Sequence, residues 1–488
     1  MRTPAIIIVF VLLGSFLFLT NQYEVNQMTA YLRTGGCERF YHPLPKNFTT
    51  LNKEIKPLFL ANKEELHIFG KNLTDLPHGY FDDIDCFKKL KLSNNYLNHI
   101  PLTIQSLASL KELNLSNNQI EGIPFNFFED MVNLTKVDLS FNNLKKIPIA
   151  QFNDLKHYNL SNNSIADIRE QSNIVLSQKE TIRIQSINLM SNGLKYIPNI
   201  LANVQNLKTL TLSDNYINTI NSFDEETIFN DLNSLVLTNN HIVMLPEYSG
   251  AFPQLEHLHL NNNKLISDVR LMGYYRLKEA NFNNQLIKSI TLGGTYNLET
   301  LNAKANRLND FTILKTFPKL TKINLQENEF LITPDFSNAI NLEELNLSMN
   351  HLNYMNWEGI SHIKKVNLSY NSLTEIPEIN NHNNHKVKEL NLFNNNIKVL
   401  NLDDLPLSLE ELNLNSNELT TLKARKKHSN LLHLKLAYNN LTNISISFLK
   451  KMPNLKSLQI NDIYSKNEKL AQQLRDYCYQ KNIKLILE

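Results

Sequence analysis

One spacing constrains the fold of this chain more than any other feature. The pattern Leu-x-Leu-x-x-Asn-x-Leu returns every 21 to 29 residues, and LKLSNNYL, LNLSNNQI and VDLSFNNL are clear copies. Such a period is typical of a solenoid, in which each repeat packs only on its neighbours. We therefore expect about seventeen stacked repeats plus end caps. The Asn stands at Asn95, Asn118, Asn142, Asn163, Asn192, Asn215, Asn240, Asn263, Asn306, Asn328, Asn350, Asn371, Asn395, Asn417 and Asn439, with Lys71 in an opening copy and Gln285 in a weak one.

Each residue type in the repeat has a physical role. In a strand, alternate side chains point to opposite faces, so Leu-x-Leu buries its leucines and leaves x exposed. The Asn amide can both donate and accept, which suits it to pair backbone groups where the chain turns off the strand. The pattern resembles the leucine-rich repeat. That resemblance implies an α/β solenoid, a horseshoe with a parallel β-sheet on its concave face.

The ends of the chain predict export and capping. Met1 and Arg2 precede an apolar run, AIIIVFVLLGSFLFL, of signal-peptide length, and an uncleaved membrane anchor is the alternative. A cut near Thr20 leaves a secreted, extracellular chain, for which we expect no membrane span. We expect a signal peptide at residues 1–20, an N-terminal cap at 21–65, the repeat array at 66–460 and a capping helix region at 461–488.

Three cysteines, Cys37, Cys86 and Cys478, stand in this oxidising setting. The simplest arrangement joins Cys37 to Cys86 as part of the N-terminal cap, and three free thiols are the alternative. The segment KNEKLAQQLRDYCYQK, with Leu470, Leu474 and Tyr477 at helical spacing, predicts an amphipathic helix over the last repeat. Cys478 is then either available to link a partner covalently or buried as an inert cap residue.

The sequence gives no indication of catalysis. It contains no HExxH, Gly-x-Ser-x-Gly, Walker or GxGxxG motif, and we expect neither an enzyme nor a cofactor. The formal net charge is +2, without the basic clusters that a nucleic-acid partner needs. His257 and His259 share a strand face, and His382 and His385 share a loop, but zinc takes three or four ligands. We therefore expect no metal site.

N-glycosylation sequons suggest where a ligand binds. They occur at Asn47, Asn72, Asn114, Asn133, Asn159, Asn162, Asn346, Asn367, Asn440 and Asn443. A glycan is bulky and obstructs docking, so the stretch from Asn162 to Asn346, which has no sequon between its ends, is the predicted binding window. Its exposed strand positions include Thr211, Val236, His257, His259, Asn281 and Lys304. The alternative is that LNLS is simply common repeat sequence.

A narrower resemblance follows from the uneven repeat lengths and the ending LKSLQINDIYSKNEKLAQQLRDYCYQ. These features resemble the mosquito-type leucine-rich immune proteins of insects, in a form without the coiled coil. The resemblance implies a circulating protein whose partner is a complement-like thioester protein. The Cys-rich segment and coiled coil by which that family pairs are not found up to Glu488, so pairing by that route is not expected.

Two functions remain open at this stage. The first is a secreted protein that binds a protein or glycan on its concave face, in innate immune recognition or as a scaffold for complement-like proteins. The second is a cell-adhesion or extracellular-matrix protein that acts in development. The exposed positions of a solenoid vary without affecting the fold, so the repeat pattern does not name the ligand.

Overall fold

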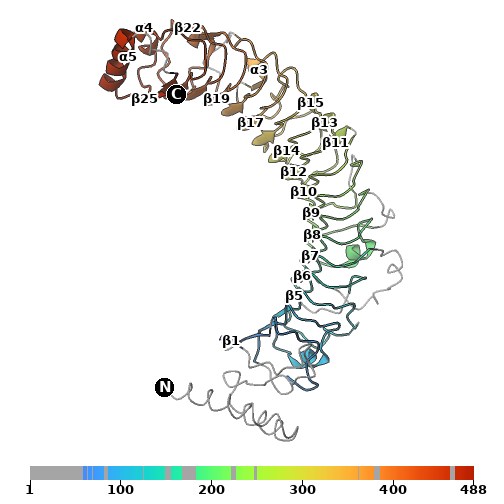
Figure 1. The fold of residues 1–488 in the computed structure, drawn as a ribbon. Coiled ribbons are helices and arrows are strands. Elements are labelled where there is room, and N and C mark those ends of the chain that lie inside the picture. Colours follow the sequence, from blue (N-terminus) through green and yellow to red (C-terminus); the bar gives the residue numbers. More distant parts are fainter. Residues whose placement is uncertain are drawn as a thin grey trace, which may run out of the picture. The chain divides into compact units, whose positions relative to one another are not determined.

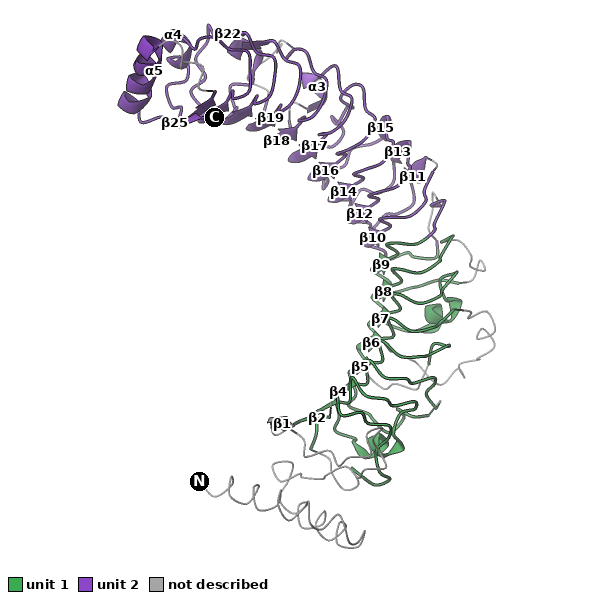
Figure 2. Ribbon diagram, in the orientation of Figure 1, with its two compact units in different colours: residues 1–240, 251–254 green, residues 241–250, 255–488 purple. Residues whose placement is uncertain are grey.

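The computed structural model describes residues 59–488 apart from 63, 69, 82–85, 125, 149–154, 167–182, 221–226, 247–249, 267, 361, 378–384 and 462–467. The predicted signal peptide, Cys37, Asn47, His382 and most of the long insertion after Asn163 lie outside the described residues. The chain forms two compact units (Figure 2). Unit 1 comprises residues 1–240 and 251–254, and unit 2 comprises residues 241–250 and 255–488.

Unit 1 is a stack of short strands joined by longer return segments. Its strands are β1 (Phe59–Asn62), β2 (Glu65–His67), β3 (Lys89–Lys91), β4 (Glu112–Asn114), β5 (Lys136–Asp138), β6 (His157–Asn159), β7 (Ser186–Asn188), β8 (Thr209–Thr211) and β9 (Ser234–Val236). β1 pairs antiparallel with β2, and β2 to β9 pair in parallel in chain order. The 3-10 helices η3 (Leu102–Ser106) and η5 (Asn199–Asn203) lie in return segments.

Unit 2 repeats this arrangement. Its main strands are β10 (His257–His259), β12 (Glu279–Asn281), β14 (Thr300–Asn302), β16 (Lys322–Asn324), β17 (Glu344–Asn346), β18 (Lys365–Asn367), β19 (Glu389–Asn391), β21 (Glu411–Asn413), β23 (His433–Lys435), β24 (Ser457–Ile460) and β25 (Lys484–Leu487). All pair in parallel with the next in this order. Every predicted repeat carries one strand, which confirms the predicted parallel solenoid.

Unit 2 also forms sheets on its return segments. β11 (Val269–Leu271), β13 (Ser289–Leu292) and β15 (Asp310–Ile313) pair in parallel on the side of the turns opposite β10, β12 and β14 (Figure 1). β20 (Val399–Asn401) pairs with β22 (Thr421–Lys423), and the 3-10 helix η7 (Leu402–Asp404) follows β20. Pro334 lies in the return segment after β16, one turn beyond β15, and a proline there has no N–H with which to extend the ladder.

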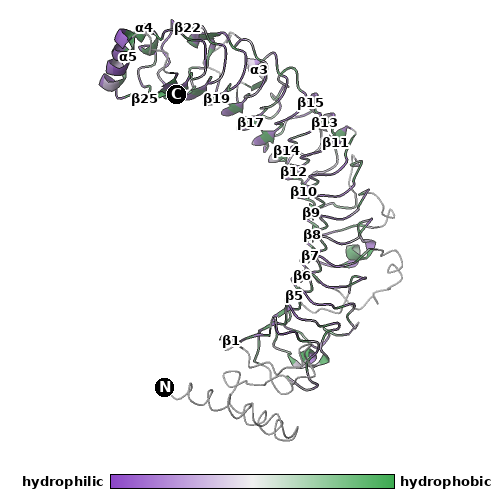
Figure 3. Cartoon of the chain, in the orientation of Figure 1, coloured by the Kyte–Doolittle hydropathy of each residue, from purple (hydrophilic) through white to green (hydrophobic). Residues whose placement is uncertain are grey.

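Short helices complete unit 2. They are α3 (Trp357–Ile360), α4 (Ile446–Leu449) and α5 (Glu468–Gln480), the last in the segment for which spacing predicts a helix. Most of α5 is hydrophilic, but Ala471, Leu474 and Cys478 are buried along one side (Figure 3). β25 after α5 adds a further strand, which the repeat pattern does not predict.

The repeat Asn holds successive turns together. Asn350 Nδ2 donates to the carbonyl oxygens of Leu347 in its own turn and Leu325 in the preceding turn, both at 3.0 Å. Its Oδ1 accepts from Phe330 N at 3.1 Å. Gln285 makes equivalent contacts in the weak repeat, through Nε2 to Leu260 O at 2.8 Å. One amide thus satisfies buried backbone groups of two turns, as the sequence predicts.

The residue before each repeat Asn turns the chain sharply. Asn94, Asn117 and Asn394 stand there with φ of 58°, 54° and 55°. Asn tolerates this left-handed conformation better than other L-residues, whereas bulky side chains rarely adopt it. Tyr370 and Met349 nevertheless adopt it, with φ of 56° and 57°. The turn therefore imposes its geometry on whichever side chain stands there.

The first prediction concerns the core of β17 and its turn. Leu347, directly after β17, is fully buried, whereas Glu344 at the start of β17 is half-exposed. Leu347→Ala should lower the free energy of unfolding by about 2 to 5 kcal/mol through lost burial and a cavity. Glu344→Gln should change it by less than about 1 kcal/mol. Urea denaturation of both variants checks this, and equal losses would show that the assigned faces are wrong.

The second prediction compares one substitution at two nearby sites. Asn350→Asp removes the donors for two buried carbonyls. At about 1 to 3 kcal/mol for each unpaired group, it should lower the free energy of unfolding by about 2 to 6 kcal/mol. Asn346→Asp should cost less than about 1 kcal/mol, because Asp138 occupies the equivalent strand position in unit 1 and accepts from Ser140 N at 2.9 Å. Denaturation midpoints measure the difference. Similar losses at both sites would contradict the bridging role of Asn350.

Candidate binding site

A groove of about 560 Å³ runs along the open face of the main sheet in unit 2. Two rows of side chains line it, because the first and third residues of each strand point to this face and the middle residue is buried. The first row is Thr300, Lys322, Glu344, Lys365, Glu389, Glu411 and His433, and the second is Asn302, Asn324, Asn346, Asn367, Asn391, Asn413 and Lys435. We call this the unit 2 groove. Its volume suits a ligand site.

The second row is an asparagine ladder. In-register pairing aligns Asn281, Asn302, Asn324, Asn346, Asn367, Asn391 and Asn413 along the sheet. From β16 to β21, Oδ1 of each ladder Asn accepts from the backbone N–H two residues later, for example Phe393 N to Asn391 at 3.1 Å. Because the oxygens are engaged by the backbone, the Nδ2 groups are the donors that the ladder offers.

The first row alternates in charge from Lys322 to Glu389, and a second carboxylate, Glu411, follows. Lys322 lies 3.1 Å from Glu344, and Lys365 lies 2.8 Å from Glu389, measured from Nζ to the nearest carboxylate oxygen. The hydrogen bond to Glu389, together with its charge, raises the pKa of Lys365. Exposed ion pairs of this kind stabilise a fold only weakly. Their effect is to keep the floor of the groove rich in both donors and acceptors without a net charge of either sign.

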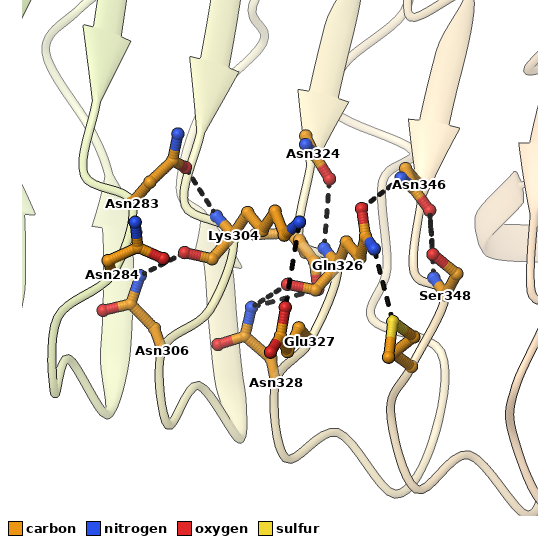
Figure 4. A network of polar contacts seen from close by, with 12 residues as sticks. Asn283, Asn284, Lys304, Asn306, Asn324, Gln326, Glu327, Asn328, Asn346 and Ser348 are labelled. Atoms are coloured by element: carbon orange, nitrogen blue, oxygen red, sulfur yellow. Dashed lines mark hydrogen bonds and ion pairs between the residues drawn. The ribbon is translucent and has the colours of Figure 1, made fainter. Parts of the chain in front are cut away.

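A polar network links the ladder to the flank of the groove (Figure 4). Asn346 Nδ2 lies 3.4 Å from Gln326 Oε1, and Gln326 Nε2 lies 3.3 Å from Met349 Sδ. At β14 the pattern changes, because Lys304 N donates to Asn283 at 2.8 Å. Asn302 Oδ1 is consequently buried with no donor among the described residues. The ladder is therefore continuous from β16 to β21 and altered at β14.

Apolar side chains lie beside this network. Met349 and Tyr370 are 44% and 47% exposed, and Phe393 is half-buried. The rings of Tyr370 and Phe393 contact edge to face, with centroids 5.1 Å apart. All three residues follow ladder strands within a few positions, so the turn geometry places them at the edge of the groove. We call them the aromatic edge.

The sequence-predicted window is divided between the units. Thr211 and Val236 pair across β8 and β9 in unit 1. His257 and His259 lie on β10 in unit 2, and Asn281 lies on β12. Lys304 lies two residues beyond β14, and its Nζ is 3.8 Å from Glu327 Oε2. None of these six residues lines the unit 2 groove, although the last part of the window, from Thr300 to Asn346, does. The window residues therefore remain a prediction.

The structure does join three of those residues into a cluster with Glu279. His257 Nδ1 lies 3.2 Å from Glu279 Oε2, and Asn281 Nδ2 lies 2.8 Å from Glu279 Oε1 and 2.7 Å from His259 Nδ1. Burial lowers the pKa of His259. Burial opposes ionisation of Glu279, but hydrogen bonds from Asn281 and His257 lower its pKa overall. The sequence analysis missed Glu279. Glu279 and His257 hold the same position in successive repeats, so aligning the two repeats would have predicted this contact.

Within the described residues, no group of three or more His, Cys, Asp and Glu side chains is arranged to hold a metal. The same residues include no helix that is both long and apolar enough to cross a membrane.

The predicted glycosylation sites fall into two groups. Asn133, Asn440 and Asn443 are exposed, whereas Asn72, Asn114, Asn159, Asn162, Asn346 and Asn367 are half-buried. Asn346 and Asn367 lie in the unit 2 groove, where Ser348 and Ser369 supply the backbone N–H bonds to their oxygens. A glycan on either Asn would occupy the groove, so glycosylation there and ligand binding there exclude each other.

The cysteines lie at opposite ends of the described chain. Cys86 is disulfide-bonded, but Cys37 lies outside the described residues, so their pairing remains a prediction. Cys478 is a free cysteine, 2% exposed, and burial raises the pKa of its thiol. A buried thiol with a raised pKa reacts slowly, which favours the inert cap residue over a covalent link to a partner.

Comparison with known proteins agrees with this geometry. A model described as "Leucine rich repeat" matches residues 64–120, and one described as "Leucine Rich repeats (2 copies)" matches residues 108–157. The zebrafish (Danio rerio) transforming growth factor beta activator LRRC33 is 27% identical over 355 residues, which cover 67% of this chain and 50% of that protein. The chain thus spans half the length of this relative.

Two solved structures share the fold. A Leptospira interrogans LRR protein matches with a TM-score of 0.55 and 22% identity, over 86% of this chain and 94% of that one. A chain of the Drosophila Toll–Spatzle complex matches with a TM-score of 0.63 and 20% identity, over 88% of this chain and 61% of that one. The repeat pattern, the sheet and these likenesses together show a leucine-rich repeat fold.

The third prediction concerns acidification. The pKa of His259 is lowered in the fold, so below its unfolded pKa of about 6.5 the unfolded chain binds more protons. The stability that the neutral His259 side chain contributes at neutral pH is therefore lost as the pH falls from about 6.5 through the pKa of His259 in the folded protein. The urea midpoint of unit 2 should decrease over this range, and His259→Asn should reduce the decrease. His351→Asn, at an exposed site, is the control, and equal pH dependence in both variants would contradict this prediction.

Proposed function

We propose that this chain is a secreted leucine-rich repeat protein that binds another macromolecule on the open face of its sheet. Its role is innate immune recognition, or scaffolding of complement-like proteins. The observation that carries the proposal is the unit 2 groove, in which amide donors, lysines and carboxylates line the open face of the sheet. The leucine-rich repeat fold typically serves as a binding scaffold, and we propose that the chain is not an enzyme.

A second role has its own support. The similarity to a protein described as a transforming growth factor beta activator covers 67% of this chain. It favours a role at the cell surface or in the extracellular matrix during development, with a protein ligand of the growth-factor kind. The immune role is supported by the resemblance of the repeat spacing and C-terminal segment to leucine-rich immune proteins. Both roles use the same binding surface, so one experiment addresses the surface for both.

The mature protein of this proposal is a glycoprotein with a disulfide from Cys86 to Cys37. The exposed sequons Asn133, Asn440 and Asn443 are its most accessible glycosylation sites. A complement-like thioester protein remains a proposed partner, and nucleic acid does not, because the groove carries carboxylates as well as lysines.

The fourth prediction tests the surface with a new glycan. Lys304→Thr completes a sequon at Asn302, which lies at one end of the unit 2 groove and within the sequence-predicted window. Once mass spectrometry shows the glycan to be present, it should block docking and reduce partner recovery from body fluid about tenfold or more.

Lys304→Ala, which adds no sequon, is the matched control and should recover the partner normally. Mass spectrometry of the recovered material identifies the partner and separates the immune role from the adhesion role. Full recovery by the Lys304→Thr protein with Asn302 glycosylated would overturn binding at this surface.

A further inference from the structure

The regular spacing of the unit 2 groove restricts the chemistry of its ligand. The strands pair in parallel and in register, so from β16 to β21 each turn presents an Asn amide at the same height on the sheet. Neighbouring strands in a sheet lie about 4.8 Å apart. A polymer whose successive units lie close to this spacing can place one unit at each turn. A polymer whose units are spaced differently falls out of step with the turns.

An extended peptide does not have this repeat. It advances by about 3.3 to 3.6 Å per residue, so its backbone groups fall out of step with the ladder after one turn. In a linear chain of β-1,4-linked sugar rings, the advance from one ring to the next is close to the strand spacing, and successive rings are turned over about the chain axis. Both edges of each ring carry polar groups, so each ring can still meet one ladder Asn and one residue of the charged row.

The polar groups also fit a sugar chain. The ladder oxygens accept hydrogen bonds from the backbone, for example in Asn367 and Asn391. The Nδ2 groups of these two residues donate to none of the described residues, so they are available to donate to a ligand. Glu344 and Glu389 accept, and Lys322 and Lys365 donate. Ring hydroxyls can do both, so they can pair with the two rows at once. Alternating lysine and glutamate disfavours a polyanion, because the carboxylates would repel it.

The aromatic edge supplies the remaining contact. Tyr370 is 47% exposed and touches Phe393, whose backbone N–H binds the ladder residue Asn391. An exposed ring of this kind offers an apolar face next to a row of polar groups. The C–H face of a sugar ring can pack on it while the hydroxyls reach the groove floor.

We propose that, granted the binding role proposed above, the unit 2 groove takes a linear, neutral chain of β-1,4-linked sugar rings. The chain lies across the strands from β16 to β21, one ring to a turn. Asn324, Asn346, Asn367 and Asn391 donate to it, and Tyr370 packs on a ring face. A protein ligand of the groove is the competing assignment.

The experiment is calorimetric titration of the secreted protein with β-1,4-linked N-acetylglucosamine oligosaccharides, from the disaccharide to the hexasaccharide. Each added ring should raise affinity about threefold to tenfold, since each adds one or two hydrogen bonds. High salt should have little effect. Malto-oligosaccharides, whose α-1,4 linkage coils the chain, should not show this increase. A constant affinity at all lengths would overturn the assignment.

Variants locate the site. Asn367→Val combined with Asn391→Val removes two donors and copies Val236, which occupies the same strand position in β9. This protein should bind the hexasaccharide about tenfold to hundredfold more weakly. Asn188→Val in unit 1 is the matched control, because it removes an equivalent bond from Met190 N and leaves the groove intact. Equal binding by the two variant proteins would overturn the assignment.

Two further variants address the edge and the sequons. Tyr370→Ala should weaken binding, whereas Phe141→Ala, at the equivalent exposed turn position in unit 1, should not; Ala305 already occupies this position in another turn. Ser348→Ala with Ser369→Ala removes both groove sequons and keeps the ladder. This protein should bind the hexasaccharide at least as well as the parent.

The outcomes separate this assignment from the proposed function. Failure of every oligosaccharide to bind the sequon-free protein, together with partner recovery blocked by a glycan at Asn302, would overturn the sugar ligand and leave a protein ligand. Failure to bind together with unaffected partner recovery would overturn both.

Discussion

The structure depends on one side-chain amide that is repeated along the chain. In turn after turn an Asn such as Asn350 donates to a carbonyl of its own turn and to one of the turn before, and Gln285 makes the second of these contacts in the weak repeat. Without that amide, the sharp turn off each strand would leave buried backbone groups unpaired, at a cost of about 1 to 3 kcal/mol each. Leucine burial supplies most of the stability, but it is the amide that makes the turn compatible with a stacked core.

This division of roles leaves one sheet face free for recognition. Stability comes from the middle residue of each strand and from the amide behind the turn, both of which are buried. The first and third residues of each strand are not needed for the core, so their chemistry can change with little effect on the fold. In unit 2 they form a continuous array of donors and acceptors, whereas in unit 1 Asp138, Thr211 and Val236 interrupt the row of asparagines at the third strand position.

Much of the fold could be predicted from sequence because the repeat is local. The strand positions, the buried leucines and the role of Asn350 all follow from a pattern eight residues long. The binding groove could not be placed in this way, since it depends on pairing between turns. The register that sets Glu279 opposite His257, the asparagine ladder and β25 all involve residues about twenty or more positions apart. Sequon spacing predicted a stretch that overlaps the groove only in its last part, from Thr300 to Asn346.

The account centres on a ligand held against the open face of unit 2, and hydroxyl-radical footprinting measures that most directly. Met349, Tyr370 and Phe393 lie at the groove edge, whereas Phe141 and Tyr216 are exposed in unit 1. Saturation with the bound ligand should lower the oxidation rate of the first three several-fold and leave the two unit 1 residues unchanged. Unchanged oxidation of Met349, Tyr370 and Phe393 in a saturated complex would contradict the account.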